Sequence, residues 1–346
     1  MENQDVVLGK NSVEIVGIVK EQKLKEITYT KDGQEFEAIS GSLVIACGEF
    51  KTVEIRLMVN KLTKKGTVNK TYEKLQGFIQ GDYLTMVDNI EEATRVKIRG
   101  NGDFTPKLEE NRFANKERTE VITAPSVSLG FGNITIDNTI PEEDFKAMVD
   151  VDVYIGSIEE EINNNDEETG RVIMQTYLPL YAKEGLDIMP LKVVAGVLPA
   201  TETEDECDVA QAVRDYISEG DTVNMWIDIN HERIVKKVAK GGGIGRAKIE
   251  DSTTYINEFV MIGGEPIDDV EKQFDEDFIR KALQERKIRL DSVLTDAITR
   301  DEVNATVNRG RGISSRPNGR RLVKTNATNQ DSATTNGTTR RGSFGF

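Results

Sequence analysis

Alternation of apolar and polar residues predicts that the first part of the chain is built from β-strands. A period of two residues is the pattern of a half-buried strand, because successive side chains point to opposite faces. Residues 52–59 show it most clearly, since Val53, Ile55, Leu57 and Val59 share one face. Apolar residues at helical spacing then predict one short helix. The predicted order is strands over 12–20, 41–47 and 52–59, a helix over 72–80, and strands over 93–104 and 118–131.

The same order of elements recurs in the second half of the chain. Each predicted helix is followed by Gly-Asp and then by a strand, at Gly81-Asp82 and at Gly220-Asp221, which supports a duplication. Residues 134–144 are predicted to join the two halves by a strand and a turn. The second set is strands over 149–161, 170–181 and 188–196, a helix over 208–221, and strands over 222–230 and 253–264.

Five short strands with one helix between the third and the fourth is the element order of the oligonucleotide-binding (OB) fold, a small Greek-key barrel. A β-sandwich could use the same strands, but it does not predict a helix at the same place in both halves. We therefore predict a mainly β protein with two tandem five-stranded OB-type barrels, the first over residues 1–140 and the second over residues 141–265.

Two further segments follow the predicted barrels. Pro266 opens a helical pattern over 267–300, so residues 266–302 are predicted to form an amphipathic helix that packs on a barrel or on a second copy of the chain. From Val303 to the end the composition is Asn, Thr, Ser, Gly and Arg, which predicts a disordered basic tail. The stripe of the helix is Val270, Phe274, Ile279, Leu283, Leu290 and Leu294.

The net charge of −15 is distributed unevenly. Residues 303–346 carry eight Arg or Lys and one Asp, or +7, so residues 1–302 carry −22. A body of this charge repels polyanions at long range unless its basic residues gather on one face. A nucleic-acid-binding protein with a tethered basic arm shows the same asymmetry. Charge alone leaves both interpretations open.

Carboxylates are abundant in this chain, but histidine and cysteine are scarce, with one His and two Cys. The single histidine, His231, is interpreted as an ordinary surface residue, and Cys47 and Cys207 lack the spacing of metal or redox motifs. Residues 159–168 form an acidic stretch that we interpret as a solvated loop, with a Mg²⁺ or Ca²⁺ site as the alternative. We predict that the protein is not an enzyme and has no catalytic residues, cofactor or bound metal.

Two lysine-rich segments are candidates for phosphate contacts. The first follows the third strand, where Tyr72 adds a platform on which a base can stack; a solvated loop is the alternative. The second surrounds the glycines of residues 241–245, which lack the GKS/T of a P-loop and lie between two predicted strands at the edge of an OB groove. The cations are Lys61, Lys64, Lys65 and Lys70 in the first segment, and Lys236, Lys237, Arg246 and Lys248 in the second.

Aromatic and basic residues on the second and third strands of each barrel complete the predicted site, because this face borders the OB groove. In the first barrel they are Phe50 and Arg56. Trp226, on the fourth strand of the second barrel, fits the core equally well. The second barrel contributes Arg171, Tyr177, Tyr181, Lys183 and Lys192.

Six segments carry a resemblance to single-stranded DNA-binding proteins encoded by bacteriophages of Gram-positive hosts. The resemblance covers residues 12 to about 300 and lies in pattern rather than in one specific motif; the segments are VEIVGIV, GSLVIAC and TVEIRLMVNKL in the first half, and VDVYIGSIEEEI with ETGRVIMQTYLPLY and YINEFVMIGGEPI in the second. It implies a barrel groove that holds bases on aromatic platforms and a flexible tail that recruits replication partners. Such tails are typically acidic, whereas this one keeps Phe344 and Phe346 but is basic.

The leading hypothesis is therefore a non-catalytic single-stranded DNA-binding protein in phage-type replication or recombination. Its expected partners are single-stranded DNA and replication or recombination proteins, with the helix over 267–300 available for oligomer contacts. The alternative is a structural or adaptor protein, such as a virion component, whose barrels make protein contacts. The N-terminal residues show no secretory pattern and no apolar run is long enough to span a membrane, so we expect a cytoplasmic protein, in the host cell if phage-encoded.

Overall fold

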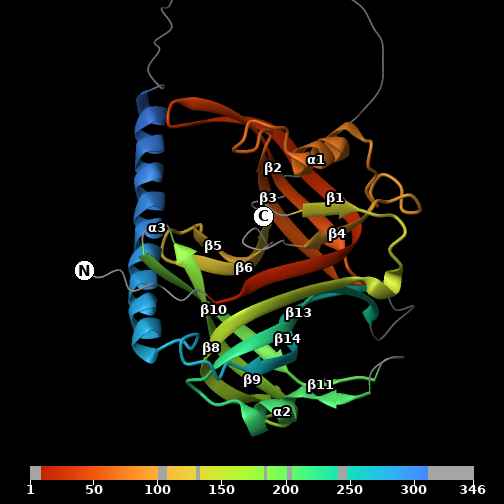
Figure 1. The fold of residues 1–346 in the computed structure, drawn as a ribbon, viewed down its shortest axis with the longest axis vertical. Helices are drawn as coiled ribbons and strands as arrows, with labels where there is room; N and C mark the ends of the chain where they lie inside the picture. The colour runs from red at the N-terminus through yellow and green to blue at the C-terminus, as the bar shows by residue number, and fades with distance from the viewer. Residues whose placement is uncertain are drawn as a thin grey trace, which may run out of the picture. The chain divides into compact units, whose positions relative to one another are not determined.

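The first three strands form an antiparallel meander, as the alternation predicts. β1 (Asn11–Lys31), β2 (Gln34–Ala46) and β3 (Thr52–Asn60) pair in order, and the odd-numbered side chains of β3 are buried in the core. The fold is taken from a computed structural model that describes residues 9–99, 107–129, 133–182, 185–200, 205–240 and 248–310 (Figure 1).

Helix α1 (Lys70–Gln80) begins and ends at residues that favour helix termini. The Asn69 side chain accepts a hydrogen bond from the Thr71 N–H at 3.0 Å, which satisfies one of the free N–H groups of the first turn. Gly81 ends the helix in the left-handed conformation, with φ of 85°. The predicted helix over 72–80 is therefore confirmed within two residues.

The rest of the first half closes on these strands by non-local pairing. β4 (Arg95–Arg99) pairs with β1, and β5 (Lys107–Ala114) forms a hairpin with β6 (Val121–Leu129). The end of β6 runs parallel to β3, with Ile55 opposite Val127. β7 (Asn133–Ile136) then pairs with β4. The sequence did not predict β5, whose residues lack alternation of apolar and polar positions.

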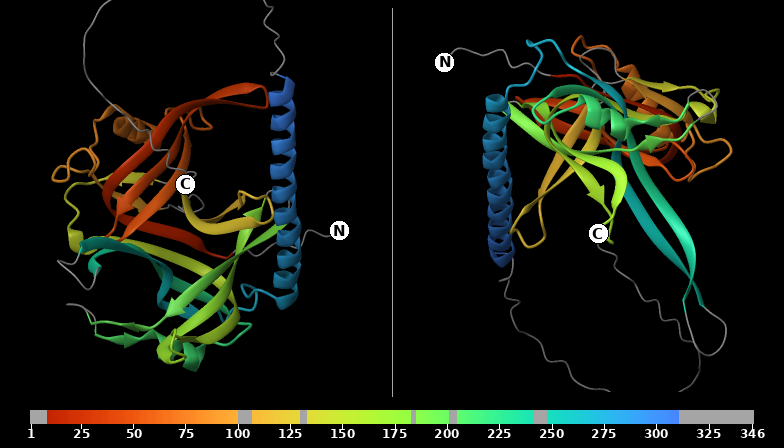
Figure 2. Two further views of the ribbon diagram at one scale, coloured as in Figure 1. Left: turned by 180° about the vertical axis from the view of Figure 1, so that it is seen from behind. Right: turned by 90° about the horizontal axis from the view of Figure 1, so that it is seen from below.

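The second half forms a closed ring of five strands. β8 (Lys146–Ile162), β9 (Glu168–Ala182) and β10 (Gly185–Ala195) are antiparallel neighbours. β10 then runs parallel to β14 (Lys248–Pro266), which pairs with β13 (Thr222–Lys240). Pairing of β13 with β8 closes the ring. The hairpin of β13 and β14 is much longer than the predicted strands and projects from the ring (Figure 2).

One short helix lies between the third and fourth strands of this ring. A two-stranded ribbon of β11 (Val197–Leu198) and β12 (Cys207–Asp208) precedes α2 (Val209–Tyr216), and the Asp208 carboxylate caps the helix through the Gln211 N–H at 2.9 Å. The prediction of 208–221 was five residues too long at its C-terminal end. Gly220 and Asp221 instead exchange backbone hydrogen bonds with Ile155 of β8.

The two halves share one sheet and one core. β1 pairs with β8 antiparallel, with Asn11 opposite Val151, so the strands of both halves belong to a single twelve-stranded sheet. One cluster of buried side chains runs through both halves, from Ile15 of β1 to Ile227 of β13. The structure thus confirms a mainly β protein with a closed five-stranded barrel and additional strands.

The C-terminal helix starts later than the sequence predicts. α3 (Glu276–Gly310) begins after Asp275, whose carboxylate accepts a hydrogen bond from the Asp277 N–H at 3.2 Å. Residues 267–275 are not helical, because Thr222 binds the Ile267 N–H through its carbonyl and the Phe274 N–H through its hydroxyl. Val270 is 79% exposed, so the predicted stripe is wrong at this position.

The predicted tail lies mostly outside the described residues. Residues 1–298 form one compact unit, and the contacts of α3 described below belong to it. Within the described part of the chain, no helix has the length and apolar character needed to cross a bilayer. Of the two free cysteines, Cys47 is buried and Cys207 exposed.

Gly41 is required where β2 passes close to β1. Its φ is 145°, and a Cβ at this position would lie 2.0 Å from the Lys23 carbonyl oxygen. Because backbone strain adds to a clash that only main-chain movement can relieve, Gly41→Ala should lower the free energy of unfolding by about 3 kcal/mol. Gly33→Ala is the control, since Gly33 has a φ of 77° but no atom nearby, and should cost about 1 kcal/mol. Urea unfolding measures both, and equal losses would contradict the close approach.

Candidate nucleic-acid interface

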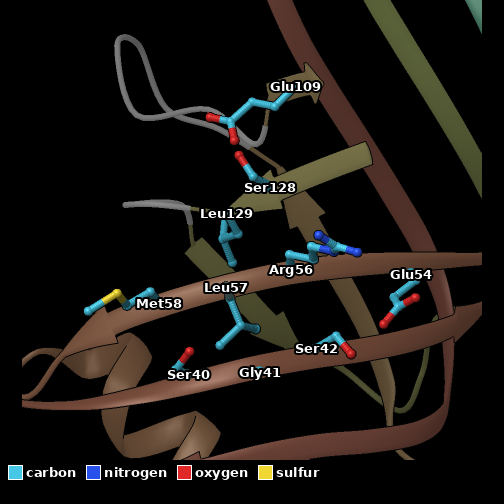
Figure 3. Close-up of a pocket in the computed structure, with 10 residues that line it drawn as sticks. All are labelled: Ser40, Gly41, Ser42, Glu54, Arg56, Leu57, Met58, Glu109, Ser128 and Leu129. Atoms are coloured by element: carbon cyan, nitrogen blue, oxygen red, sulfur yellow. The ribbon is translucent and has the colours of Figure 1, made fainter. Parts of the chain in front are cut away.

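An open hollow of about 520 Å³ lies on the outer face of β2 and β3 (Figure 3). Leu57 of β3 and Leu129 of β6 face one another at its centre. Arg56 supplies the positive charge, and Glu54 and Glu109 are the carboxylates. The remaining lining residues are Ser40, Gly41, Ser42, Met58 and Ser128. The hollow therefore combines an apolar floor with one cation.

The hollow continues toward the second half of the chain. Glu54 and Arg56 also line a neighbouring pocket, together with His231 of β13 and Phe259 of β14. The two rings meet edge to face, with centroids 5.7 Å apart. A salt bridge between Lys51 and Asp228 joins the two halves nearby.

A third pocket lies farther along β2 and β3. It is lined by Lys61 and Lys64, two of the predicted phosphate contacts, and by Phe36 of β2. The ring of Phe36 stacks on Tyr29, with centroids 5.5 Å apart. Lys61 binds Glu37 at 2.5 Å, and this hydrogen bond raises the pKa of Lys61. We call the three pockets along β3 the β3 groove.

The β5–β6 hairpin forms one wall of the β3 groove. Glu109 and Asn111 of β5 line it, as do Ser126 and Ser128 of β6. The Asn111 side chain accepts a hydrogen bond from the Arg56 guanidinium at 2.6 Å. This contact holds the Arg56 side chain against the hairpin.

Other predicted residues of the first half fall into two groups. Lys65 and Lys70 are exposed, and so is Phe50 at 48%. Tyr72 is only 4% exposed and packs in the core. The prediction that Tyr72 stacks on a base is therefore corrected, because neither face of its ring is accessible. Phe36 is the aromatic residue that lies beside the lysines.

In the second half, α3 covers part of the β9–β10 face. Tyr177 is half-buried and packs against a cluster that includes Phe274 and Ile279, so α3 covers part of the ring that was predicted to stack on a base. Arg171 is ion-paired with Glu258 at 2.8 Å. Lys192 is exposed on the same face. Trp226 is 43% exposed and its ring lies against Gly263, so it is not a core residue.

Several predicted residues cannot be placed by their side chains. Lys183 and Arg246 lie outside the described residues, as do the other residues of 241–247. Tyr181, Lys236, Lys237 and Lys248 lie on strands whose backbone alone is described there. The long hairpin carries the last three of them away from the ring (Figure 2).

Phe36, Asn111, His231 and Phe259 are among the groove residues that sequence reasoning missed, and one signal was available for Phe36. Phe36 lies near the start of β2, the strand that pairs with β3, so its position near Lys61 followed from a hairpin register. Asn111 lies on a strand that was not predicted. His231, interpreted as a surface residue, and Phe259 reach the groove only because the two halves pack together.

The sole histidine makes stability depend on pH. Burial lowers the pKa of His231 below its usual 6.5, and the charge of Lys51 lowers it further. The unfolded chain then binds a proton more readily than the folded one, so the free energy of unfolding should fall as pH drops below 6.5. In His231→Gln, the part of this fall in the free energy of unfolding that arises from His231 should be absent between about pH 7 and pH 5, above the range in which carboxylates titrate. Urea unfolding over this range measures it, and identical slopes for both proteins would contradict it.

Comparison with known proteins gives structural similarities and a family. No curated protein matches the chain. Similar solved structures include the single-stranded DNA-binding protein of Thermus aquaticus, with 10% identity, a TM-score of 0.38, and coverage of 75% of this chain and 94% of that chain. A deletion mutant of that protein has 11% identity and a TM-score of 0.35, and the match covers 78% of this chain and 98% of that chain. A replication protein A heterotrimer bound to single-stranded DNA has 9% identity and a TM-score of 0.21, and the match covers 75% of this chain and 67% of that chain.

TM-scores of this size carry no information about the ligand of this chain. The family assignment is independent of them. Among the described residues, no group of three or more His, Cys, Asp or Glu side chains is placed to hold a metal ion.

A sequence model of the YorF family matches residues 10–295, which is most of the chain. The protein therefore belongs to the YorF family.

Proposed function

We propose that this protein is a non-catalytic single-stranded DNA-binding protein that acts in phage-type DNA replication or recombination. The observation that carries the proposal is the β3 groove, a row of three pockets along the second and third strands whose lining combines apolar side chains with cations and carboxylates. In OB barrels this face binds oligonucleotides and oligosaccharides. Phosphate-binding cations at Arg56, Lys61 and Lys64 favour the oligonucleotide.

The proposed fold is two successive OB-type barrels. In the second half, the ring of β8, β9, β10, β14 and β13 has a parallel pair between its third and fifth strands and a helix between its third and fourth. In the first half, β6 is parallel to β3 and β7 pairs with β4. We assign β6 and β7 together to the fifth strand position, which closes the first barrel.

The charges at the groove suggest how a strand lies in it. Arg56 attracts phosphates in the first pocket, where Glu54 and Glu109 repel them, and the lysines of the third pocket share its lining with Glu35 and Glu37. A single strand would therefore direct its bases toward Met58, which is 45% exposed, and keep its phosphates near the cations. Phe36, which is half-buried, would offer a ring at the end of the path beside the lysines. Such contacts tolerate any sequence, because every base has an apolar face.

Fluorescence anisotropy with labelled oligo-dT of about 30 nucleotides tests the proposal, since OB folds cover about 4–16 nucleotides each. The affinity should be measurable at about 50 mM salt and should fall steeply toward about 200 mM. The single strand should bind more tightly than a duplex of the same length.

Three outcomes would overturn the proposal. Absence of binding at the lowest salt would leave the structural or adaptor role. Equal binding of duplex and single strand would exclude the groove, because a duplex does not fit a channel that separates bases from phosphates. Tighter binding of oligo-U of equal length would replace DNA by RNA.

A further inference from the structure

The β5–β6 hairpin, the wall of the β3 groove, rests on helix α3 through a buried ionic network. Glu110 of β5 accepts hydrogen bonds from both terminal nitrogens of Arg286, one of them at 2.6 Å. Arg112 donates to Glu110 at 2.7 Å and to Asp187 of β10 at 2.8 Å. Arg289 of α3 forms a salt bridge with Asp187, with 3.4 Å between its Nη1 and the Oδ1 of Asp187. The network thus joins the hairpin to α3 and to the second half of the chain.

Burial makes these ion pairs different from those on the protein surface. The side chains of Glu110 and Arg286 are 3% and 9% exposed, whereas those of Arg280 and Glu276, on the same helix, are 59% and 72% exposed. A buried charge is held strictly to its partner, because leaving it unpaired is costly. The Arg286 guanidinium also donates to the Ile188 carbonyl at 3.3 Å.

The two faces of β5 carry different functions. Glu110 and Arg112 point to the network, whereas the alternate residues Glu109 and Asn111 line the β3 groove. Asn111 in turn accepts the hydrogen bond of Arg56. At its beginning β5 is also held by Asn11, whose side chain exchanges two hydrogen bonds with the Leu108 backbone. Beyond Leu108, the side chains of Glu110 and Arg112 join β5 to α3 and β10 through the network.

We infer that Arg286 is a positioning residue for single-strand binding, and that α3 acts as a strut that holds the groove wall in place. The inference rests on the proposed function of the β3 groove. Arg286 itself does not line the groove. If removal of the Arg286 guanidinium left the hairpin in place about a tenth of the time, the apparent Kd for DNA would rise about tenfold.

The test compares Arg286→Gln with Arg280→Gln in the full chain, at a temperature where circular dichroism shows both to be folded. Arg280 is the matched control, because it pairs with Glu276 and Asp277 on the exposed face of α3. Arg286→Gln should raise the Kd for oligo-dT about tenfold and leave the salt dependence unchanged, because every phosphate-binding cation stays in place. Arg286→Lys, which keeps the charge but not the two-pronged geometry, should recover part of the affinity.

Hydrogen exchange without DNA provides an independent measurement. Amides of residues 107–129 should exchange faster in Arg286→Gln than in the wild type, whereas those of β2, which pairs with β1 and β3 and not with the hairpin, should not change. If the wild type binds DNA and the variant changes neither affinity nor exchange, the strut is overturned and the proposed function stands. If the wild type does not bind DNA, the proposed function fails and exchange alone decides whether α3 holds the hairpin. A reduced salt dependence in Arg286→Gln would instead make Arg286 a direct phosphate contact and overturn the positioning role.

Discussion

Replacement of Glu110 by glutamine should lower the free energy of unfolding by about 3–5 kcal/mol, the cost of breaking a buried ion pair. Glutamine has nearly the same shape but no charge, so the guanidinium of Arg286, only 9% exposed, would lose its counter-ion. Arg112 would retain Asp187. Guanidinium unfolding followed by circular dichroism measures the change.

The control for this variant is Glu276→Gln. Glu276 also pairs with an arginine of α3, Arg280, at 2.8 Å, but the pair is exposed and should contribute only about 0.3–0.5 kcal/mol. If both variants lowered the free energy of unfolding by a similar amount, water would be solvating the Arg286 guanidinium in Glu110→Gln, and the burial of this ion pair would be contradicted.

Replacement of Arg56 by glutamate should weaken oligo-dT binding by about ten- to a hundredfold, corresponding to one charge-assisted contact. Among the described residues that line the hollow of Figure 3, the change removes the only cation and adds a third carboxylate beside Glu54 and Glu109. The slope of log Kd against log salt should also fall by about 0.7 for each phosphate that is no longer neutralised. Anisotropy titrations over a salt series provide both values.

Arg280→Glu controls for the overall change of charge, because it makes the same substitution on the exposed face of α3. It should alter the affinity by less than about twofold at 200 mM salt, where the screening length is about 7 Å. An equal decrease in affinity for both variants would show that net charge rather than the β3 groove governs binding.

The order of strands could be predicted because local pattern and local capping agree. Alternation marks β3, and Asn69 and Gly81 mark the ends of α1. β5 could not be found in this way. Its sequence, KLEENRFA, places Glu110 and Arg112 on an inward face, where their partners come from α3 and β10, many residues away. When the inward side chains of a strand are charged and their partners lie far away in the sequence, the strand has the polar pattern of a loop.

The candidate site residues could likewise be predicted only where the signal is local in the sequence. Lys61 and Lys64 were found because a lysine-rich loop after a strand is a local feature. Tyr72 and Tyr177 were not distinguishable from stacking residues, because an aromatic ring suits a core and a groove equally well. Their burial depends on α1 packing into the core and on α3 covering β9. Phe259 and His231 required knowledge of how the halves meet.

The pairing of β1 with β8 joins the two halves through their backbones, so we expect them to unfold as a single cooperative unit rather than as two domains on a linker. Separation of the halves between β7 and β8 would expose a row of unpaired backbone groups on each, along the register from Asn11 to Val16. Such open edges are templates for aggregation. Each half expressed alone should therefore be insoluble, and the whole chain should unfold in one calorimetric transition.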